Sequence, residues 1–238
     1  MTHTASDKII MISGANRGIG KAIAEHLLTC GYRLSLGVRN RESLSDTVLA
    51  NNKNVLVCYY DAVDKESAKA WVEKTANHFK RIDGLVNNAG IYRQVSIEEG
   101  DEEDLDTMWE VNAKGPWRLL RAAFPWLKKS GQARVINIIS LSGKRLKSEQ
   151  STGYAMSKFA ARALHQGCRQ SGWDHGIRAS ALCTSFVKTD MASDVTSSLP
   201  EDITEPADVA HAVAFLLNQP NNAAINEFSI NCRLEAEN

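Results

Sequence analysis

Two side chains within one predicted helix have the spacing that proton-transfer chemistry needs. Tyr154 and Lys158 are four residues apart, so an α-helix places them on the same face. A free tyrosine has a pKa of about 10, and a nearby ammonium group favours the phenolate form. The pair therefore predicts a phenol that exchanges a proton near neutral pH. Ser140, at the end of a predicted strand before this helix, adds a hydroxyl that could orient a reacting oxygen atom.

A second candidate site follows the first predicted strand, where the chain reads Ser13-Gly14-Ala15-Asn16-Arg17-Gly18-Ile19-Gly20. Glycines allow a tight turn and a close approach of the backbone to a ligand, and the free N–H groups at a helix start can bind a pyrophosphate. The spacing Gly-x-x-x-Gly-x-Gly differs from the general dinucleotide fingerprint Gly-x-Gly-x-x-Gly. The turn favours a nucleotide site, and a strand-to-helix connection without a ligand is the alternative.

Together these features resemble the short-chain dehydrogenase/reductase family, whose first turn is usually Thr-Gly-x-x-x-Gly-x-Gly. Ser13 replaces the threonine and keeps a hydroxyl. The resemblance extends from Lys8 to about Asn231. The other family motifs follow in the expected order: Asp61-Ala62 after the third predicted strand, Asn87-Asn88-Ala89-Gly90 after the fourth, Asn112 in the next helix, then Ser140 and Tyr154-x-x-x-Lys158.

The resemblance implies a role for each of these residues. The implied catalytic set is Ser140, Tyr154, Lys158 and Asn112, in which Asn112 helps to hold a water molecule that links Lys158 to solvent. Asp61 and the backbone of Ala62 would contact the adenine, and Asn88 with its neighbours would line the ribose. The implied cofactor-binding residues are Ser13, Gly14, Asn16, Arg17, Gly18, Ile19, Gly20, Arg39, Asp61, Ala62, Asn88, Ala89, Gly90, Tyr154, Lys158, Val187 and Thr189.

The implied activity is transfer of a hydride between a nicotinamide and a carbonyl or alcohol carbon, with Tyr154 as acid or base. Ser142 is a competing hydroxyl, but the family pattern Ser-x-x-Gly at Ser140–Gly143 favours Ser140. Two other functions remain as alternatives. One is a cofactor-binding regulatory protein with little turnover, and the other is a reductase of 3-oxoacyl thioesters.

The residues after the second predicted strand favour NADP(H) over NAD(H). An acidic side chain there would bind the ribose hydroxyls and repel a 2′-phosphate, and none follows Val38 directly. Arg39 follows instead and Arg17 lies in the glycine turn, so two guanidinium groups could converge on a 2′-phosphate. Arg41 is readily explained as an exposed surface charge.

Two segments lie near the predicted substrate site. One departs from the family pattern, and the other adds positive charge near the site. After the sixth predicted strand the family usually has Pro-Gly-x-x-x-Thr, whereas this chain has Thr184-Ser185-Phe186-Val187-Lys188-Thr189. Only Ala192–Glu205 separates this turn from the next helix, which predicts an open site that accepts bulky or varied carbonyl compounds. The loop with Lys144, Arg145 and Lys147 is compatible with an anionic substrate, although a solvated basic loop is favoured.

The elements that position these motifs alternate along the chain. Seven apolar or β-branched runs predict strands: Lys8–Ser13, Arg33–Val38, Val55–Tyr60, Gly84–Val86, Val135–Ile139, Arg178–Cys183 and Glu227–Asn231. Apolar residues at helical spacing predict helices over Gly20–Cys30, Lys65–Phe79, Leu105–Leu127, Tyr154–Trp173 and Pro206–Leu217. We expect an α/β fold, a doubly wound, Rossmann-like parallel sheet in a single domain over residues 1–238, with its ligand site at the carboxyl ends of the strands.

Composition is that of an ordinary globular protein. The 238 residues include 28 basic and 28 acidic side chains, and this balance argues against a nucleic-acid partner or binding to an anionic membrane. The five cysteines and six histidines have no metal-ligand or disulfide spacing, so no metal ion is expected. The acidic run Glu98–Asp104 is interpreted as a solvated helix start.

The same features predict where the protein works and with what. The chain shows no signal-peptide pattern and no apolar run long enough to cross a bilayer, which predicts a cytoplasmic protein. The expected partner is a small-molecule carbonyl or alcohol substrate. The resemblance further implies a homo-oligomer, a dimer or tetramer, formed through the helices at Leu105–Leu127 and Tyr154–Trp173.

Overall fold

Strands and helices alternate throughout the computed structural model, which describes residues 8–195 and 199–234. The strands are β1 Ile9–Ser13, β2 Arg33–Val38, β3 Val55–Tyr59, β4 Gly84–Asn87, β5 Arg134–Ile138, β6 Arg178–Thr184 and β7 Glu227–Ile230. The α-helices are α1 Gly18–Thr29, α2 Ser67–Phe79, α3 Glu102–Trp109, α4 Gly115–Ser130, α5 Thr152–Gly172, α6 Asp190–Val195 and α7 Pro206–Leu217. Each predicted strand is present, with ends that differ by at most one residue.

All seven strands form one parallel sheet in the order β3-β2-β1-β4-β5-β6-β7. The chain first builds outward from β1 to β3 and then returns to place β4 on the other side of β1. The loops after β1 and β4 therefore leave in opposite directions, which opens a crevice at the carboxyl ends of the strands. This topology confirms the predicted doubly wound, Rossmann-like sheet.

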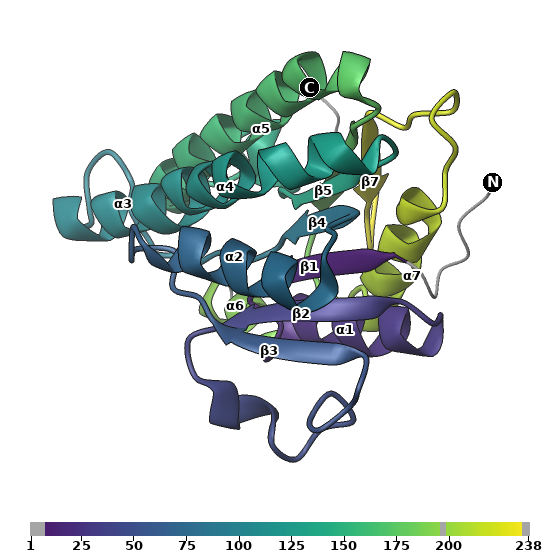
Figure 1. The fold of residues 1–238 in the computed structure, drawn as a ribbon. Coiled ribbons are helices and arrows are strands. Elements are labelled where there is room, and N and C mark those ends of the chain that lie inside the picture. The colour runs from purple at the N-terminus through teal and green to yellow at the C-terminus, as the bar shows by residue number, and fades with distance from the viewer. Residues whose placement is uncertain (1–7, 196–198, 235–238) are drawn as a thin grey trace.

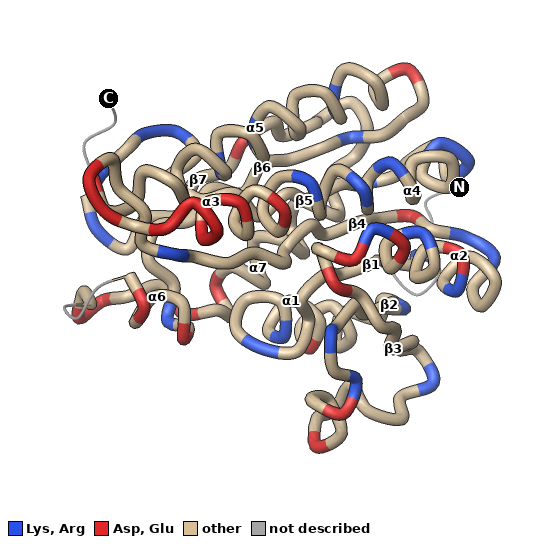
Figure 2. Tube along the Cα trace, turned by 90° about the vertical axis from the view of Figure 1, so that its left-hand side faces the viewer, with Lys and Arg blue, Asp and Glu red and all other residues tan. Residues whose placement is uncertain are grey.

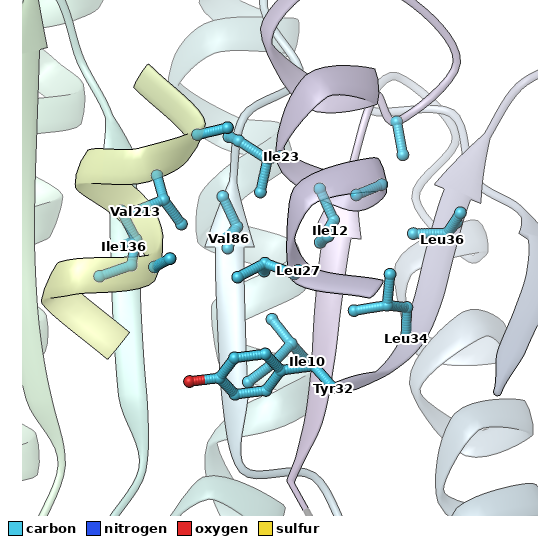
Figure 3. Close-up of a cluster of buried hydrophobic side chains, with 14 of the residues drawn as sticks. Ile10, Ile12, Ile23, Leu27, Tyr32, Leu34, Leu36, Val86, Ile136 and Val213 are labelled. Carbon is cyan, nitrogen blue, oxygen red and sulfur yellow. The ribbon is translucent and has the colours of Figure 1, made fainter. Parts of the chain in front are cut away.

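Helices cover both faces of the sheet (Figure 1). Helices α1 and α7 pack together on one face, while α2, α4 and α5 cover the other. The strand β1 is buried along its whole length. Its side chains alternate between two hydrophobic cores, with Ile10 and Ile12 in the core on the α1 side and Met11 in the core on the opposite side. Figure 3 shows the α1 side, where sheet residues face α1 and α7: Ile10, Ile12, Leu34, Leu36, Val86 and Ile136 against Ile23, Leu27 and Val213.

The helix predicted over Leu105–Leu127 is not continuous, so this prediction was wrong in detail. Helix α3 ends at Trp109, a π-helical turn covers Glu110–Lys114, and α4 begins at Gly115. A π turn keeps the chain helical, so a prediction of helix over the whole segment does not separate it from the α-helices on either side. The turn contains Asn112, one of the predicted catalytic residues.

Basic and acidic residues are mixed along the trace, and the acidic residues near α3 lie at its start (Figure 2). Glu102, Glu103 and Asp104 form the first turn of α3, where carboxylates complement the helix dipole. This position confirms the interpretation of the acidic run as a helix start. Among the described helices, none is both long and apolar enough to cross a bilayer.

Hydrogen bonds between the end of β1 and the loop after β4 hold the two sides of the crevice in position. The Ser13 hydroxyl accepts hydrogen bonds from the backbone N–H groups of Asn88 and Ala89, each at 3.0 Å. The side-chain amide of Asn88 donates back to the carbonyl oxygens of Ser13 at 2.9 Å and Gly14 at 3.2 Å. Ser13 is 2% exposed, so water does not readily replace these bonds.

We predict that Ser13→Ala lowers the free energy of unfolding by about 1–3 kcal/mol, because two backbone donors lose their acceptor. Ser13→Thr keeps the hydroxyl and is expected to change this free energy by less than about 1 kcal/mol. Urea unfolding followed by circular dichroism measures both variants. An alanine variant as stable as the wild type would contradict the structural role given to this hydroxyl.

Candidate active site

A cavity of about 800 Å³ occupies the crevice at the carboxyl ends of the strands. Most of the predicted site residues line it, although the turns that carry them are far apart in the sequence. The predicted residues on its wall are Gly14, Asn16, Arg17, Gly18, Ile19, Arg39, Asp61, Ala62, Asn88, Ala89, Gly90, Ser140, Tyr154, Lys158, Val187 and Thr189. Ser13, Gly20 and Asn112 lie behind this wall and contact the residues that form it.

The conformation of the glycine turn favours glycine at three of its positions. Gly14 has a φ of +66° and Gly18 a φ of +51°, left-handed conformations that side chains disfavour. A Cβ atom at Gly20 would lie 2.2 Å from the carbonyl oxygen of Gly14 and 2.4 Å from the amide nitrogen of Asn88. The start of α1 therefore packs directly against the β1 and β4 loops, with its first N–H groups at the cavity.

Asp61 lies on the cavity wall and also shapes the loop after β3. Its carboxylate accepts a hydrogen bond from the backbone N–H of Val63 at 3.2 Å, and the Ser67 hydroxyl donates to its carbonyl oxygen at 2.6 Å. These bonds fix the backbone of Asp61 and Ala62 where it borders the cavity. Asp61 therefore shapes the loop after β3 and also lies on the cavity wall.

Tyr154 and Ser140 meet at the middle of the cavity wall. Burial raises the pKa of the Tyr154 phenol to about 12, and a hydrogen bond with Ser140 partly opposes that increase. The Tyr92 ring packs edge-on against Tyr154, with 5.4 Å between the ring centroids. Ser142 also lines the cavity, but its backbone N–H donates to the Ser140 hydroxyl at 3.1 Å.

Lys158 is buried one helical turn after Tyr154 on α5. Its ammonium lies 5.6 Å from the Tyr154 ring centroid and donates a hydrogen bond to the carbonyl oxygen of Ile138 at 3.3 Å. Burial lowers the pKa of Lys158 to about 8. The predicted proximity is therefore present, but the pKa of Tyr154 is raised and not lowered, because burial of the phenol dominates.

Asn112 holds the back of the site through three hydrogen bonds. Its side-chain oxygen accepts from the N–H of Ile91, and its amide donates to the carbonyl oxygen of Ile91, each at 2.9 Å. The same amide donates to the Ser157 hydroxyl at 3.0 Å. The π turn thus joins the loop after β4 to helix α5, one residue from Lys158.

A small cavity of about 10 Å³ lies behind Lys158, lined in part by Asn87, Asn112 and Asn137. This volume is about the minimum for one water molecule. Among the described residues none donates a hydrogen bond to the buried side-chain oxygen of Asn87. The space and the unpartnered acceptor fit a buried water molecule at this position.

His165 extends this polar region, and sequence reasoning missed it. Asn87 donates to Asn137 at 2.8 Å, the Asn137 amide lies 3.2 Å from His165 Nδ1, and His165 Nε2 lies 3.1 Å from Asn226. Burial lowers the pKa of His165, so a neutral ring fits the site. The position of His165, seven residues after Lys158 on the buried face of α5, was the available signal.

The arginines predicted near a 2′-phosphate differ in their positions. Arg17 and Arg39 both line the cavity, and Arg17 forms an exposed ion pair with Asp190 at 3.1 Å. Arg41 starts a short 3₁₀ helix, Arg41–Leu44, outside the cavity lining. Both arginines that sequence reasoning favoured therefore lie on the cavity wall.

The basic loop before Tyr154 divides into two groups. Lys144 pairs with Glu227 at 2.8 Å and is not on the cavity wall, whereas Arg145 and Lys147 line the cavity. Arg233, which sequence reasoning missed, lines the cavity beside them.

The segment Ala192–Glu205, which was expected to leave the site open, begins within α6. Its residues Ala192 and Val195 line the cavity. Residues 196–198 of this segment lie outside the described part of the chain.

Known proteins resemble this chain over most of its length. The agropine synthesis reductase of Rhizobium rhizogenes is 37% identical over 231 residues, which cover 96% of this chain but 53% of that protein. This chain thus spans about half the length of that relative. An uncharacterized oxidoreductase of Staphylococcus saprophyticus is 32% identical over 228 residues, covering 94% of this chain and 97% of that protein.

A solved structure also resembles this chain over most of its length. The alcohol dehydrogenase from the archaeon Thermococcus sibiricus, complexed with 5-hydroxy-NADP, superposes with a TM-score of 0.84 at 30% identity, covering 94% of this chain and 95% of that one. The family model for short chain dehydrogenases matches residues 8–200. With the parallel sheet and the cavity at its carboxyl edge, these matches show that the chain belongs to the short-chain dehydrogenase/reductase family of oxidoreductases.

Proposed function

We propose that this protein is an NADP(H)-dependent oxidoreductase that transfers a hydride between the nicotinamide and the carbonyl or alcohol carbon of a small molecule. The observation that carries the proposal is the convergence of Tyr154, Ser140 and Lys158 on one wall of a cavity whose other end is the glycine turn. That combination supplies a proton donor, an orienting hydroxyl and a cation beside a site for a dinucleotide.

The residues on the cavity wall fit a dinucleotide. The N–H groups at the start of α1 would hold the pyrophosphate, where a side chain at Gly20 would block the turn. Asp61 and Ala62 would contact the adenine, and the loop from Asn88 to Gly90 would line the ribose. Val187 and Thr189 would border the nicotinamide end. The cofactor, when bound, supplies the hydride.

Side chains of the protein would supply the proton and stabilise the charge that its transfer leaves. In the reductive direction Ser140 and Tyr154 would hydrogen-bond the carbonyl oxygen, and Tyr154 would transfer its proton to that oxygen as negative charge develops there. The charge of Lys158 would stabilise the phenolate that remains. Lys158 and a water molecule in the small cavity beside Asn112 would then return a proton to Tyr154.

The name of a relative supports the reductive direction. The R. rhizogenes relative is named a reductase. We therefore propose reduction as the favoured direction of the reaction.

The preference for NADP(H) rests on Arg39 and Arg17. Both lie on the cavity wall at the β1–β2 end, where a 2′-phosphate would extend from the adenine ribose. The structure of the T. sibiricus relative contains 5-hydroxy-NADP, which agrees with this preference. Asp190 now pairs with Arg17, and an exposed pair of this kind is weak enough to exchange for a phosphate.

The single domain, the cytoplasmic location and the absence of nucleic-acid or membrane partners remain predictions. The proposal of a homo-oligomer gains support from large exposed apolar side chains on the helices expected to form its interface. These are Trp109, Trp117, Met156 and Phe159.

The first experiment follows NADPH and NADH oxidation over ketones, aldehydes, quinones and 3-oxoacyl compounds. We expect NADPH-dependent turnover of at least one class, reduced about 10²- to 10⁴-fold in Tyr154→Phe because the proton donor is lost. NADPH binding, followed by nucleotide fluorescence, is expected to change only a few-fold in that variant. Tyr59→Phe, which removes an exposed hydroxyl outside the cavity lining, is the matched control.

Two outcomes would contradict this proposal. Full turnover by Tyr154→Phe would exclude Tyr154 as the proton donor. Tight NADPH binding without turnover of any compound would favour a cofactor-binding regulatory protein. Turnover confined to 3-oxoacyl thioesters would select that alternative within the same chemistry.

Cofactor preference has its own test. Arg39→Ala is expected to raise the KM for NADPH roughly 10- to 100-fold, because a charge-assisted contact with the 2′-phosphate is lost, while the KM for NADH stays nearly constant. Arg41→Ala removes a neighbouring arginine outside the cavity lining and serves as the control. Equal changes for NADPH and NADH in Arg39→Ala would overturn the assignment.

A further inference from the structure

We propose that the substrate carries an anionic group, a carboxylate or a phosphate ester, which binds between Arg145, Lys147 and Arg233 at the substrate end of the cavity. All three residues lie on the cavity wall. This inference rests on the proposed function, because it names the class of carbonyl compound that the same cavity accepts.

Three segments from different parts of the chain bring these cations together. Arg145 and Lys147 belong to the loop after β5, and the Lys147 ammonium lies 5.7 Å from the ring centroid of Phe186 in the turn after β6. Ser185 in that turn binds the chain after β7, accepting a hydrogen bond from the N–H of Cys232 at 3.2 Å. Arg233 follows directly, so the fold itself joins the three cations.

This group is separate from the arginines assigned to the cofactor. Arg17 and Arg39 follow β1 and β2, whereas Arg145 and Lys147 follow β5 and Arg233 follows β7, strands on the other side of β4 in the sheet. Ser140, at the end of β5, and Tyr154, at the start of α5, occupy the same half of the cavity as the new group. A substrate whose carbonyl oxygen reaches Tyr154 therefore extends toward the new cations.

The cations are close enough to affect one another. Burial lowers the pKa of Lys147, and the charges of Arg233 and Arg145 lower it further. Like charges that share a cavity repel each other, and a bound anion relieves that repulsion. Lys144 lies off the cavity wall, where its ammonium pairs with Glu227 at 2.8 Å.

Several polar side chains on the cavity wall belong to the same loop as Lys147 or contact Tyr154. The Tyr154 ring contacts Tyr92, whose hydroxyl lies 3.4 Å from the Ser151 hydroxyl. Gln150 and Ser148 continue the wall toward Lys147. Hydroxyls and amides along this path favour a compound with polar groups between its carbonyl and its anionic end.

The test compares pairs of carbonyl compounds that differ only in charge. One arm uses oxo acids with their methyl esters and amides, and the other uses keto sugar phosphates with the free sugars. We expect the wild type to favour the anionic member of at least one arm by about tenfold or more in kcat/KM. The arm with the larger ratio identifies the anion.

Variants then locate the preference. In Lys147→Gln/Arg233→Gln the ratio of kcat/KM between anionic and neutral members is expected to fall at least about tenfold, mainly through the KM of the anion. Lys147→Arg is expected to retain most of the ratio, because the charge remains. Lys69→Gln removes an exposed charge on α2, outside the cavity lining, and controls for net charge.

The outcomes separate this inference from the proposed function. Turnover of neutral and anionic members with equal kcat/KM, or a ratio unaffected by the double variant, would overturn the anionic site alone. If no compound turns over, calorimetric titration of NADPH-loaded protein with the same pairs replaces kinetics. Equal binding of both members would then overturn the anionic site, and the absence of turnover would count against the proposed reduction.

Discussion

The protein holds two ionisable side chains away from bulk water, with Lys158 buried and Tyr154 half-buried on the cavity wall, and the rest of the fold must stabilise them there. Desolvation raises the pKa of the phenol and lowers that of the ammonium, so each group favours its neutral form. For Lys158 the pKa falls from 10.5 to about 8, so the unfolded chain binds the proton more tightly than the folded one. Its burial opposes folding by about 3 kcal/mol at neutral pH, and this penalty disappears as the pH rises from about 8 through 10.5.

The sheet and its helices supply the stability that offsets this penalty. Strand β1 is buried throughout and separates two apolar cores. The loops after β1 and β4 are held together where the strand order reverses, by the hydrogen bonds between Ser13 and Asn88 and by the close packing at Gly20. The π turn at Asn112 fastens the loop after β4 to helix α5. The same contacts that close the crevice therefore hold Tyr154 and Lys158 in fixed positions.

Much of this could be predicted from the sequence, because buried parallel strands are short apolar runs and the motif residues lie at fixed distances from them. Asn112 is predicted as a site residue, but the π turn that carries it is not, because the sequence pattern indicates only that the segment is helical. The pKa of Tyr154 was predicted to fall, since spacing shows that a lysine is near but not that burial dominates. Arg233 and His165 were missed because their neighbours in space are distant in the sequence.

The central claim is that a protonated Tyr154 on the cavity wall delivers the proton in a carbonyl reduction. The pH dependence of kcat/KM for NADPH-dependent reduction, from about pH 6 to about pH 11, tests this claim most directly, because it reports the ionisation of the free enzyme. We predict a constant rate through neutral pH and a decline above about pH 8, where Lys158 loses its proton. A rate that instead rises with pH through the neutral range would mean that the reaction needs the phenolate, and would contradict the claim.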